Sequence, residues 1–278
     1  MVLSKSPGNG REQLDLFRAL PGEMAIRDAQ DLMAYPFFSL AKSRRTVPID
    51  FRSGPVTVRV EGTGAHGIAT IWDADILIWA ASQIVEACDA GIRPSRRMRA
   101  TPYEILRFIG RGTSRRDYQR LKAALDRLQS TTVATSIRET TGRRLHRFSW
   151  INEWKECADV HGRPLGIELI LADWFFAGVL DEALVLTIDP TYFRLSGGIE
   201  RWLYRLVRKH GGRQPEGWRF DFPYLHRKSG SLARPSDFAC DLRALVMRQS
   251  LPGYVLSIER RPGSPEILVF RPVPRMAR

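Results

Sequence analysis

The chain has 278 residues, of which 44% are hydrophobic and 26% charged, which excludes wholesale disorder and, at about 100–200 residues per domain, suggests two domains. Lysine and arginine number 43 against 30 acidic residues, so the formal net charge of +13 favours a polyanionic partner. No apolar run approaches the about 20 residues of a membrane-spanning helix, there is no signal-peptide core, and three widely spaced cysteines indicate neither a zinc ribbon nor a disulfide framework. We therefore expect a cytoplasmic protein without a membrane partner.

The N-terminal region, residues 1–45, is predicted to be a flexible tail. Its first 12 residues are polar and rich in glycine, serine and proline. From residue 46 the pattern changes, because apolar residues alternate with polar ones or proline over residues 47–51 and 56–60, on either side of a Gly-Pro turn. This alternation predicts a β-hairpin.

Three helices are predicted next, over residues 72–88, 103–109 and 114–129. The third has a capping serine, Ser114, and carries basic residues opposite its apolar stripe. Strands over residues 132–138 and 144–151, joined by a turn at Thr141 and Gly142, follow it. Helix, helix, turn, basic helix and ribbon is the element order of a winged helix, which we assign to residues 46–165.

The second half, residues 166–278, repeats this order. Strands 167–171 and 184–188 flank a short helix, and helices near 199–210, 223–226 and 235–249 precede a hairpin over residues 254–259 and 267–271. The two halves match locally at Pro102-Tyr103 with Pro223-Tyr224, Asp117-Tyr118 with Asp237-Phe238, Leu125 with Leu245, and Ser136-Ile137 with Ser257-Ile258. The predicted fold is therefore α+β, with two winged-helix domains in tandem after the tail. The alternative to a duplicated module is that any helix–turn–helix followed by a hairpin shows such matches.

Residues typical of catalysis are scarce. There is no phosphate-binding G-x-x-x-x-G-K-[ST] loop, and the five histidines are isolated, so no metal site stands out. The carboxylate pair Asp73 and Asp75 is more simply explained by the charge preference of a helix start. We expect no enzyme activity, no cofactor and no metal.

Basic residues instead predict contacts to DNA, against the alternative of a solvated helix face. Base contacts are predicted on the two candidate recognition helices, from Arg115, Arg116, Gln119, Arg120, Arg234 and Ser236. Backbone contacts are predicted from the remaining clusters, namely Arg96, Arg97, Arg99, Arg111, Lys122, Arg143, Arg144, Arg147, Arg201, Arg205, Arg208, Lys209, Arg260 and Arg261. For the cluster from Arg201 to Lys209, phosphate contact and a solvated face are equally good interpretations.

The segments 184–195 and 200–210 resemble the replication initiator protein A family of plasmid initiators, most specifically at Trp202-Leu-Tyr-Arg-Leu-Val-Arg-Lys-His210. The likeness extends from about Tyr35 to Val273. It implies a bacterial protein that binds repeated sequences (iterons) at a plasmid origin, helps to open AT-rich DNA and recruits the host chromosomal initiator and replicative helicase. It also implies a role in copy control, autorepression and a possible homodimer.

A short motif in the tail, Gln13-Leu14-Asp15-Leu16-Phe17, is similar to the pentapeptide by which bacterial proteins dock on the replicative sliding clamp. A flexible arm would present Leu16 and Phe17 to an apolar pocket. In the alternative interpretation, the same residues pack on the body of the protein.

Two rival functions remain open at the level of sequence. A transcriptional repressor with the same fold would read DNA in the same way. A nicking enzyme acting at an origin would need a metal cluster or a catalytic tyrosine beside histidines, and Tyr192 and Tyr204 have no histidine pair close by in the sequence.

Overall fold

The computed structural model describes residues 15–139, 145–211, 214 and 216–273. Its helices and strands are, in chain order, β1 (Leu16–Arg18), β2 (Arg27–Ala29), α1 (Gln30–Ala34), β3 (Ile49–Ser53), β4 (Val56–Glu61), α2 (Ala74–Asp89), β5 (Arg97–Ala100), α3 (Pro102–Phe108), α4 (Arg115–Ser130), β6 (Thr132–Thr135), β7 (His146–Ser149), β8 (Ile151–Ala158), β9 (Pro164–Leu171), α5 (Asp173–Leu180), β10 (Val185–Thr187), α6 (Gly198–Gly211), β11 (Trp218–Asp221), α7 (Phe222–Ser229), α8 (Pro235–Arg248), β12 (Tyr254–Glu259) and β13 (Ile267–Pro272), with 3₁₀ turns at Glu182–Leu184 and Pro190–Arg194. The molecule is mixed α+β, as the sequence predicted.

The helices around residues 100–130 begin where their capping residues stand. The side chains of Thr101 and Ser114 each accept a hydrogen bond from the backbone N–H three residues later. The side chains of Glu104 and Asp117 in turn accept from the backbone N–H of the cap residue. The same positions in the second half are occupied by Asp221, which caps α7, and by Arg234 before α8. The predicted helices of both halves are therefore confirmed.

The same arrangement of elements occurs twice. We call α2, β5, α3, α4, β8 and β9 the first repeat, and α6, β11, α7, α8, β12 and β13 the second repeat. Both sheets have the same strand order, with the first strand beside the last, β5-β9-β8 and β11-β13-β12. Equivalent positions in the two repeats are 120 residues apart in the sequence. Four pairs share this offset, namely the caps Thr101 and Asp221, the left-handed glycines Gly110 and Gly230, the third helical residues Asp117 and Asp237, and the buried Leu125 and Leu245.

This offset changes two of the matches expected from the sequence. Pro102 aligns with Phe222 rather than Pro223, because the caps before them set the register. Ser136 has no counterpart at Ser257, since Ser136 follows β6, which lies outside the first repeat, whereas Ser257 lies within β12.

The ribbon predicted after α4 belongs to another sheet. β6 and β7 pair antiparallel as predicted, but β6 also pairs with β4, which gives a four-stranded sheet in the order β3-β4-β6-β7. The hairpin that shares a sheet with β5 is β8–β9. The sequence did not reveal β8, because only its first residue is buried and half of its residues are exposed and polar, so the strand lacks the alternation of a half-buried strand. The predicted turn at Thr141 lies outside the described residues.

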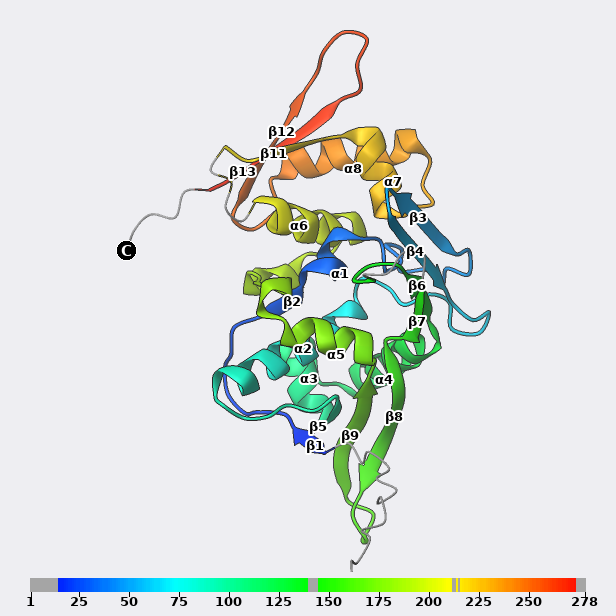
Figure 1. Ribbon diagram of the computed structural model, residues 1–278, viewed down its shortest axis with the longest axis vertical. Coiled ribbons are helices and arrows are strands. Elements are labelled where there is room, and N and C mark those ends of the chain that lie inside the picture. The colour runs from blue at the N-terminus through cyan, green and yellow to red at the C-terminus, as the bar shows by residue number, and fades with distance from the viewer. Residues whose placement is uncertain (1–14, 140–144, 212–213, 215, 274–278) are drawn as a thin grey trace, which may run out of the picture.

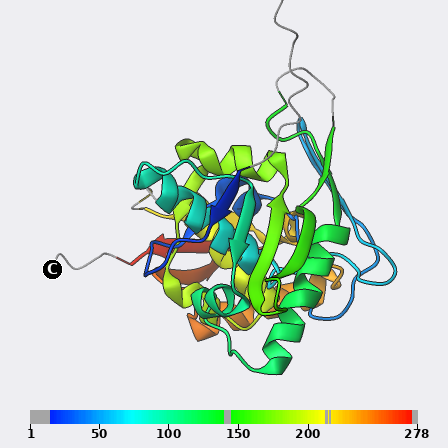
Figure 2. The same ribbon diagram turned by 90° about the horizontal axis from the view of Figure 1, so that it is seen from below.

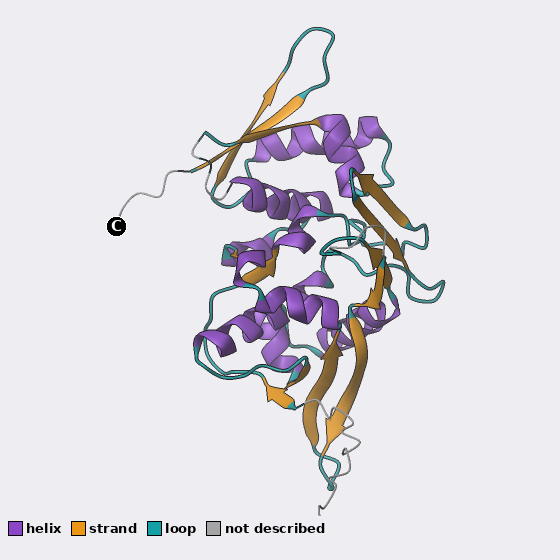
Figure 3. Cartoon of the chain, in the orientation of Figure 1, coloured by secondary structure: helices purple, strands orange, loops and turns teal. Residues whose placement is uncertain are grey.

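The two hairpins project in opposite directions along the long axis, β12–β13 at one end and β8–β9 at the other (Figure 1). Helices fill the middle of the molecule, and the sheet of β3, β4, β6 and β7 lies along one flank (Figure 3). The predicted boundary between residues 165 and 166 falls inside β9, so any division into domains has to lie after Leu171 to keep this sheet intact.

An aromatic cluster joins the flanking sheet to the helices. The rings of Phe148 on β7 and Trp174 on α5 stack at 4.9 Å between centroids, and Trp150 meets Phe37 edge-on at 5.4 Å. Trp150 and Phe37 are fully buried. Aromatic pairs of this kind add about 0.5–1.5 kcal/mol each beyond the burial of their area. These contacts therefore stabilise the packing of the flanking sheet against the helices.

Candidate nucleic-acid interface

The outer face of α4 carries the predicted base-contacting residues, and all four are exposed, namely Arg115, Arg116, Gln119 and Arg120. The capping box at Ser114 fixes the start of the helix, where these residues stand. Within the described part of the chain, Arg115 and Arg116 have no ion-pair partner, and Arg120 makes only a long contact of 3.5 Å to Asp117. These guanidinium groups are therefore available to a ligand.

One side of α4 packs on the β8–β9 hairpin. Lys122 lies 2.7 Å from Glu156 of β8, and the indole of Trp154 donates a hydrogen bond to Asp126 at 3.1 Å. Seen from the end where this hairpin projects, α4 runs along the margin of the molecule (Figure 2). The ammonium group of Lys122, which was predicted to contact the DNA backbone, is therefore already paired with a carboxylate.

The tip of the β8–β9 hairpin was not among the predicted sites. Asp159 orders this turn, since its carboxylate accepts from the N–H groups of His161 and Arg163 at 2.8 Å. Arg163 is exposed there, and Val160 is 95% exposed. No alternation or basic cluster in the sequence marks this tip, and only the pairing of β8 with β9 brings it forward.

The second repeat presents a weaker basic face. Arg234 and Ser236 are exposed at the start of α8 as predicted, but Arg234 pairs with Asp237 at 2.9 Å. Arg260, at the end of the β12–β13 hairpin, pairs with Glu266 at 2.7 Å, whereas Arg261 is exposed without a described partner.

Three predicted backbone contacts are instead structural ion pairs, which corrects the prediction for Arg201, Arg205 and Arg111. Arg201 and Arg205 of α6 are only 3% and 1% exposed. Arg201 binds Asp75 at 2.7 Å, and Arg205 binds Asp28 through two hydrogen bonds of 2.7 and 2.9 Å. Their guanidinium groups cannot reach a phosphate, because α6 turns them inward to carboxylates far away in the sequence.

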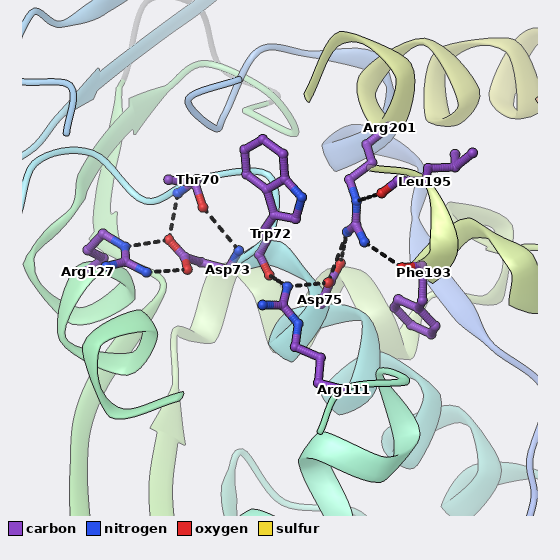
Figure 4. A network of polar contacts seen from close by, with 9 residues as sticks. All are labelled: Thr70, Trp72, Asp73, Asp75, Arg111, Arg127, Phe193, Leu195 and Arg201. Carbon is purple, nitrogen blue, oxygen red and sulfur yellow. Dashed lines mark hydrogen bonds and ion pairs between the residues drawn. The ribbon is translucent and has the colours of Figure 1, made fainter. Parts of the chain in front are cut away.

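Asp75 and Asp73, which the sequence suggested were helix-start charges, anchor this network (Figure 4). Asp75 is completely buried and accepts from both Arg201 and Arg111, at 2.7 and 3.0 Å. Burial raises the pKa of the Asp75 carboxyl above its ordinary value, although the two guanidinium groups oppose the shift. Asp73 instead holds Arg127 of α4 with two bonds of 2.7 Å.

Arg97 and Arg99 on β5 are also engaged, which corrects their assignment as free backbone contacts. Both donate to Glu168 on β9 at 2.8 Å, and Lys155 of β8 approaches the same carboxylate at 3.3 Å. Burial alone would raise the pKa of Glu168, but the hydrogen bonds from these cations outweigh it and lower the pKa to about 2.

This lowered pKa predicts acid sensitivity. A carboxyl whose pKa is lower in the folded state stabilises the fold fully above its unfolded value of about 4.5, and the contribution is lost as the pH falls towards 2. We expect Glu168→Gln to reduce the free energy of unfolding by about 2–3 kcal/mol at pH 7 and by less than half of that at pH 3. Urea unfolding of both proteins at the two pH values measures this, and an equal loss at both would contradict the assignment.

Other predicted backbone contacts lie at the surface. Arg208 is half-buried and donates to the carbonyl of Thr187 at 2.9 Å. Arg96 and Lys209 are partly exposed, and Arg147 is exposed on β7, which places it on the flanking sheet. Arg143 and Arg144 lie outside the described residues.

The clamp motif does not form an extended arm where it is described. Leu16, Phe17 and Arg18 form β1, which pairs in parallel with β5, and Phe17 is only 6% exposed. The expectation that Phe17 is presented to a clamp pocket is therefore wrong, because this ring fills the core beneath β1 and the edge of the β5 sheet takes up the strand. Gln13 and Leu14 lie outside the described residues, and Asp15 is exposed.

Within the described ranges, no group of three or more histidine, cysteine, aspartate or glutamate residues is placed to hold a metal ion. Among the helices of these ranges, none combines the length and apolar character needed to cross a bilayer.

Comparison with known proteins gives a consistent result. Residues 27–256 match the family described as "Replication initiator protein A". A protein of Wigglesworthia glossinidia brevipalpis, named "Putative replication protein", is 30% identical over 226 residues, which cover 80% of this chain and 81% of that protein. Two crystal structures of domains 2 and 3 of RctB are similar in fold at 15% identity. One covers 87% of this chain with a TM-score of 0.63, the other 88% with 0.56, and each match spans 97% of the RctB chain.

Proposed function

Because this chain belongs to the replication initiator protein A family, we propose that it initiates replication by binding duplex DNA at a plasmid origin through two winged helices. α4 and α8 would be the recognition helices, with the wings formed by β8–β9 and β12–β13. The first wing is then not the β6–β7 ribbon, which belongs to the flanking sheet. The repeated strand order β5-β9-β8 and β11-β13-β12 supports this assignment.

The observation that carries the proposal is the basic face of α4. Elsewhere, many arginines are held by buried carboxylates, as Arg205 is by Asp28. Arg115 and Arg116 stand exposed and unpaired, among the described residues, at the capped start of a helix that lies at the margin of the molecule. An arginine in this position can form a bidentate contact with the O6 and N7 atoms of guanine.

Family membership and the exposed basic face of α4 support a more detailed proposal. The two repeats would read repeated sequences, or iterons, and binding free energy would help to open neighbouring AT-rich DNA. The bound protein would recruit host replication proteins, and binding near its own gene would repress transcription and limit plasmid copy number. None of these steps requires a nucleotide site, and a homodimer would suit an origin with paired repeats.

The test is salt-titrated binding to the DNA that flanks the gene, compared with a shuffled duplex of equal composition. We expect a preference of about 10³ or more that maps to direct repeats. Equal affinity for both duplexes that collapses with salt would leave only a basic nucleic-acid binder and would contradict the proposal. Incubating supercoiled plasmid with the protein and Mg²⁺ tests the nicking alternative, and we expect no relaxation.

A further inference from the structure

A cavity of about 440 Å³ opens beside α4, on the side away from the β8–β9 hairpin. It is lined by α4, by the turn between α3 and α4, by Ile76 of α2 and Leu106 of α3, and by two stretches earlier in the chain, residues 42–44 and 66–73. At 3.6 residues per turn, Arg120 and Lys122 lie about 200° apart around the helix axis. Arg120 lines the cavity, whereas Lys122 contacts Glu156 of the hairpin.

The lining of this cavity has an excess of positive charge. Its lining includes five lysine or arginine residues and two carboxylates. Both carboxylates are engaged, since Asp73 holds Arg127, and Asp117 accepts from the N–H and hydroxyl of Ser114 (Figure 4 shows the Asp73 pair).

Two of the cations have no carboxylate partner within the described chain, Lys42 and Arg44. Both are exposed. Lys42 lies over the ring of Trp72 with its ammonium nitrogen 5.2 Å from the centroid, and Arg44 donates to the carbonyl of Ala65 at 3.2 Å. These contacts position the two side chains at the cavity without neutralising their charge.

We propose that Lys42 and Arg44 contact the phosphate backbone of the DNA strand that flanks α4 on this side. The inference rests on the proposed function. A helix with its side chains is about 10–12 Å across and the major groove about 12 Å wide, so a helix lying in the groove has a phosphate strand on each side. The hairpin occupies one side of α4, and the exposed cations of Lys42 and Arg44 occupy the other.

The sequence did not point to this surface, because Lys42 and Arg44 lie in the predicted tail, about 70 residues before α4 in the numbering. Only the fold brings the segment beside the recognition helix, where Ser39 and Ile68 are held by backbone hydrogen bonds to Ala69 and Arg45. The charge of the segment then becomes part of the same face as Arg120.

The test uses the full-length protein and the two duplexes described above. We expect Lys42→Ala/Arg44→Ala to weaken binding to both duplexes by the same factor, and to make the slope of log K against log salt concentration shallower by about 2, since each phosphate contact contributes about 0.9. Arg44→Lys should retain its share of the slope. If the alanine variant is poorly folded, Lys42→Gln/Arg44→Gln, which keeps most of the side-chain length, replaces it and should show the same change in the slope.

The matched control is Arg18→Ala/Arg93→Ala, which removes the same charge from two exposed residues. β1 lies at the opposite edge of its sheet from β8, which packs on α4. We expect this control to keep the wild-type slope. In an ethylation-interference experiment, ethylation of phosphates on one flank of the site should block binding of the wild type but should not affect binding of Lys42→Ala/Arg44→Ala.

Three outcomes separate the two proposals. If the wild type prefers its site and Lys42→Ala/Arg44→Ala titrates like the wild type, this inference is wrong and the proposed function stands. If this variant and the Arg18/Arg93 control lose affinity equally, the effect is general charge and the inference is also wrong. If the wild type binds no duplex, both proposals are wrong.

Discussion

Asp28→Ala should lower the free energy of unfolding by about 3–5 kcal/mol, because it leaves the buried guanidinium of Arg205 without its counter-charge. Asp28 on β2 and Arg205 on α6 are 1% exposed and are joined by two hydrogen bonds. Chemical unfolding monitored by circular dichroism measures the change.

The matched control is Asp50→Ala, which removes a carboxylate from an exposed pair with Arg59 and should cost about 0–1 kcal/mol. Replacing both buried partners, as Asp28→Leu/Arg205→Met, should restore much of the lost stability, since no charge is then left buried. A loss of less than about 1 kcal/mol in Asp28→Ala would show that Arg205 reaches solvent, and its phosphate contact would return as an interpretation.

Arg115→Ala/Arg116→Ala/Gln119→Ala on α4 should reduce the preference for the specific duplex by at least about 100-fold, because a good bidentate base contact contributes about 1–3 kcal/mol of discrimination. The three side chains are exposed, so we expect the melting temperature to stay close to that of the wild type. The measurement is competition between specific and shuffled duplexes at fixed salt.

Two comparisons make this result interpretable. Arg18→Ala/Arg93→Ala removes as much positive charge and should keep the preference. Arg234→Ala/Ser236→Ala on α8 shows how far the second repeat contributes to specificity. If the α4 variant instead binds every duplex more weakly by one factor, α4 contacts the backbone and base reading must be sought on α8.

The local elements followed from the sequence because their causes are local. Ser114 and Asp117 are three residues apart and mark the start of α4 by a local capping box, and the apolar stripe of that helix has helical spacing. The twofold repeat was also visible, since Asp117 and Asp237 occupy the same position in their helices. The basic outer face of α4 could be predicted for the same reason.

Strand partners were less accessible. The sequence predicted the pairing of β6 with β7, which are neighbours in the chain, but not the pairing of β6 with β4 or of β9 with β5. Alternation shows that a strand has one buried face, yet it does not specify which edge the strand joins. The ribbon predicted after α4 therefore belongs to a different sheet from the one that contains β5.

By itself the sequence determined the helices, the cap at Ser114, the repeat and the excess of positive charge, because each depends on residues close together or on composition. Only the tertiary structure decided which charges are free. The partners of Arg201 and Arg205 lie 126 and 177 residues away in the chain, at Asp75 and Asp28. The sequence of a basic helix does not show whether its arginines bind phosphate or a buried carboxylate. Burial depends on contacts between segments that only folding brings together.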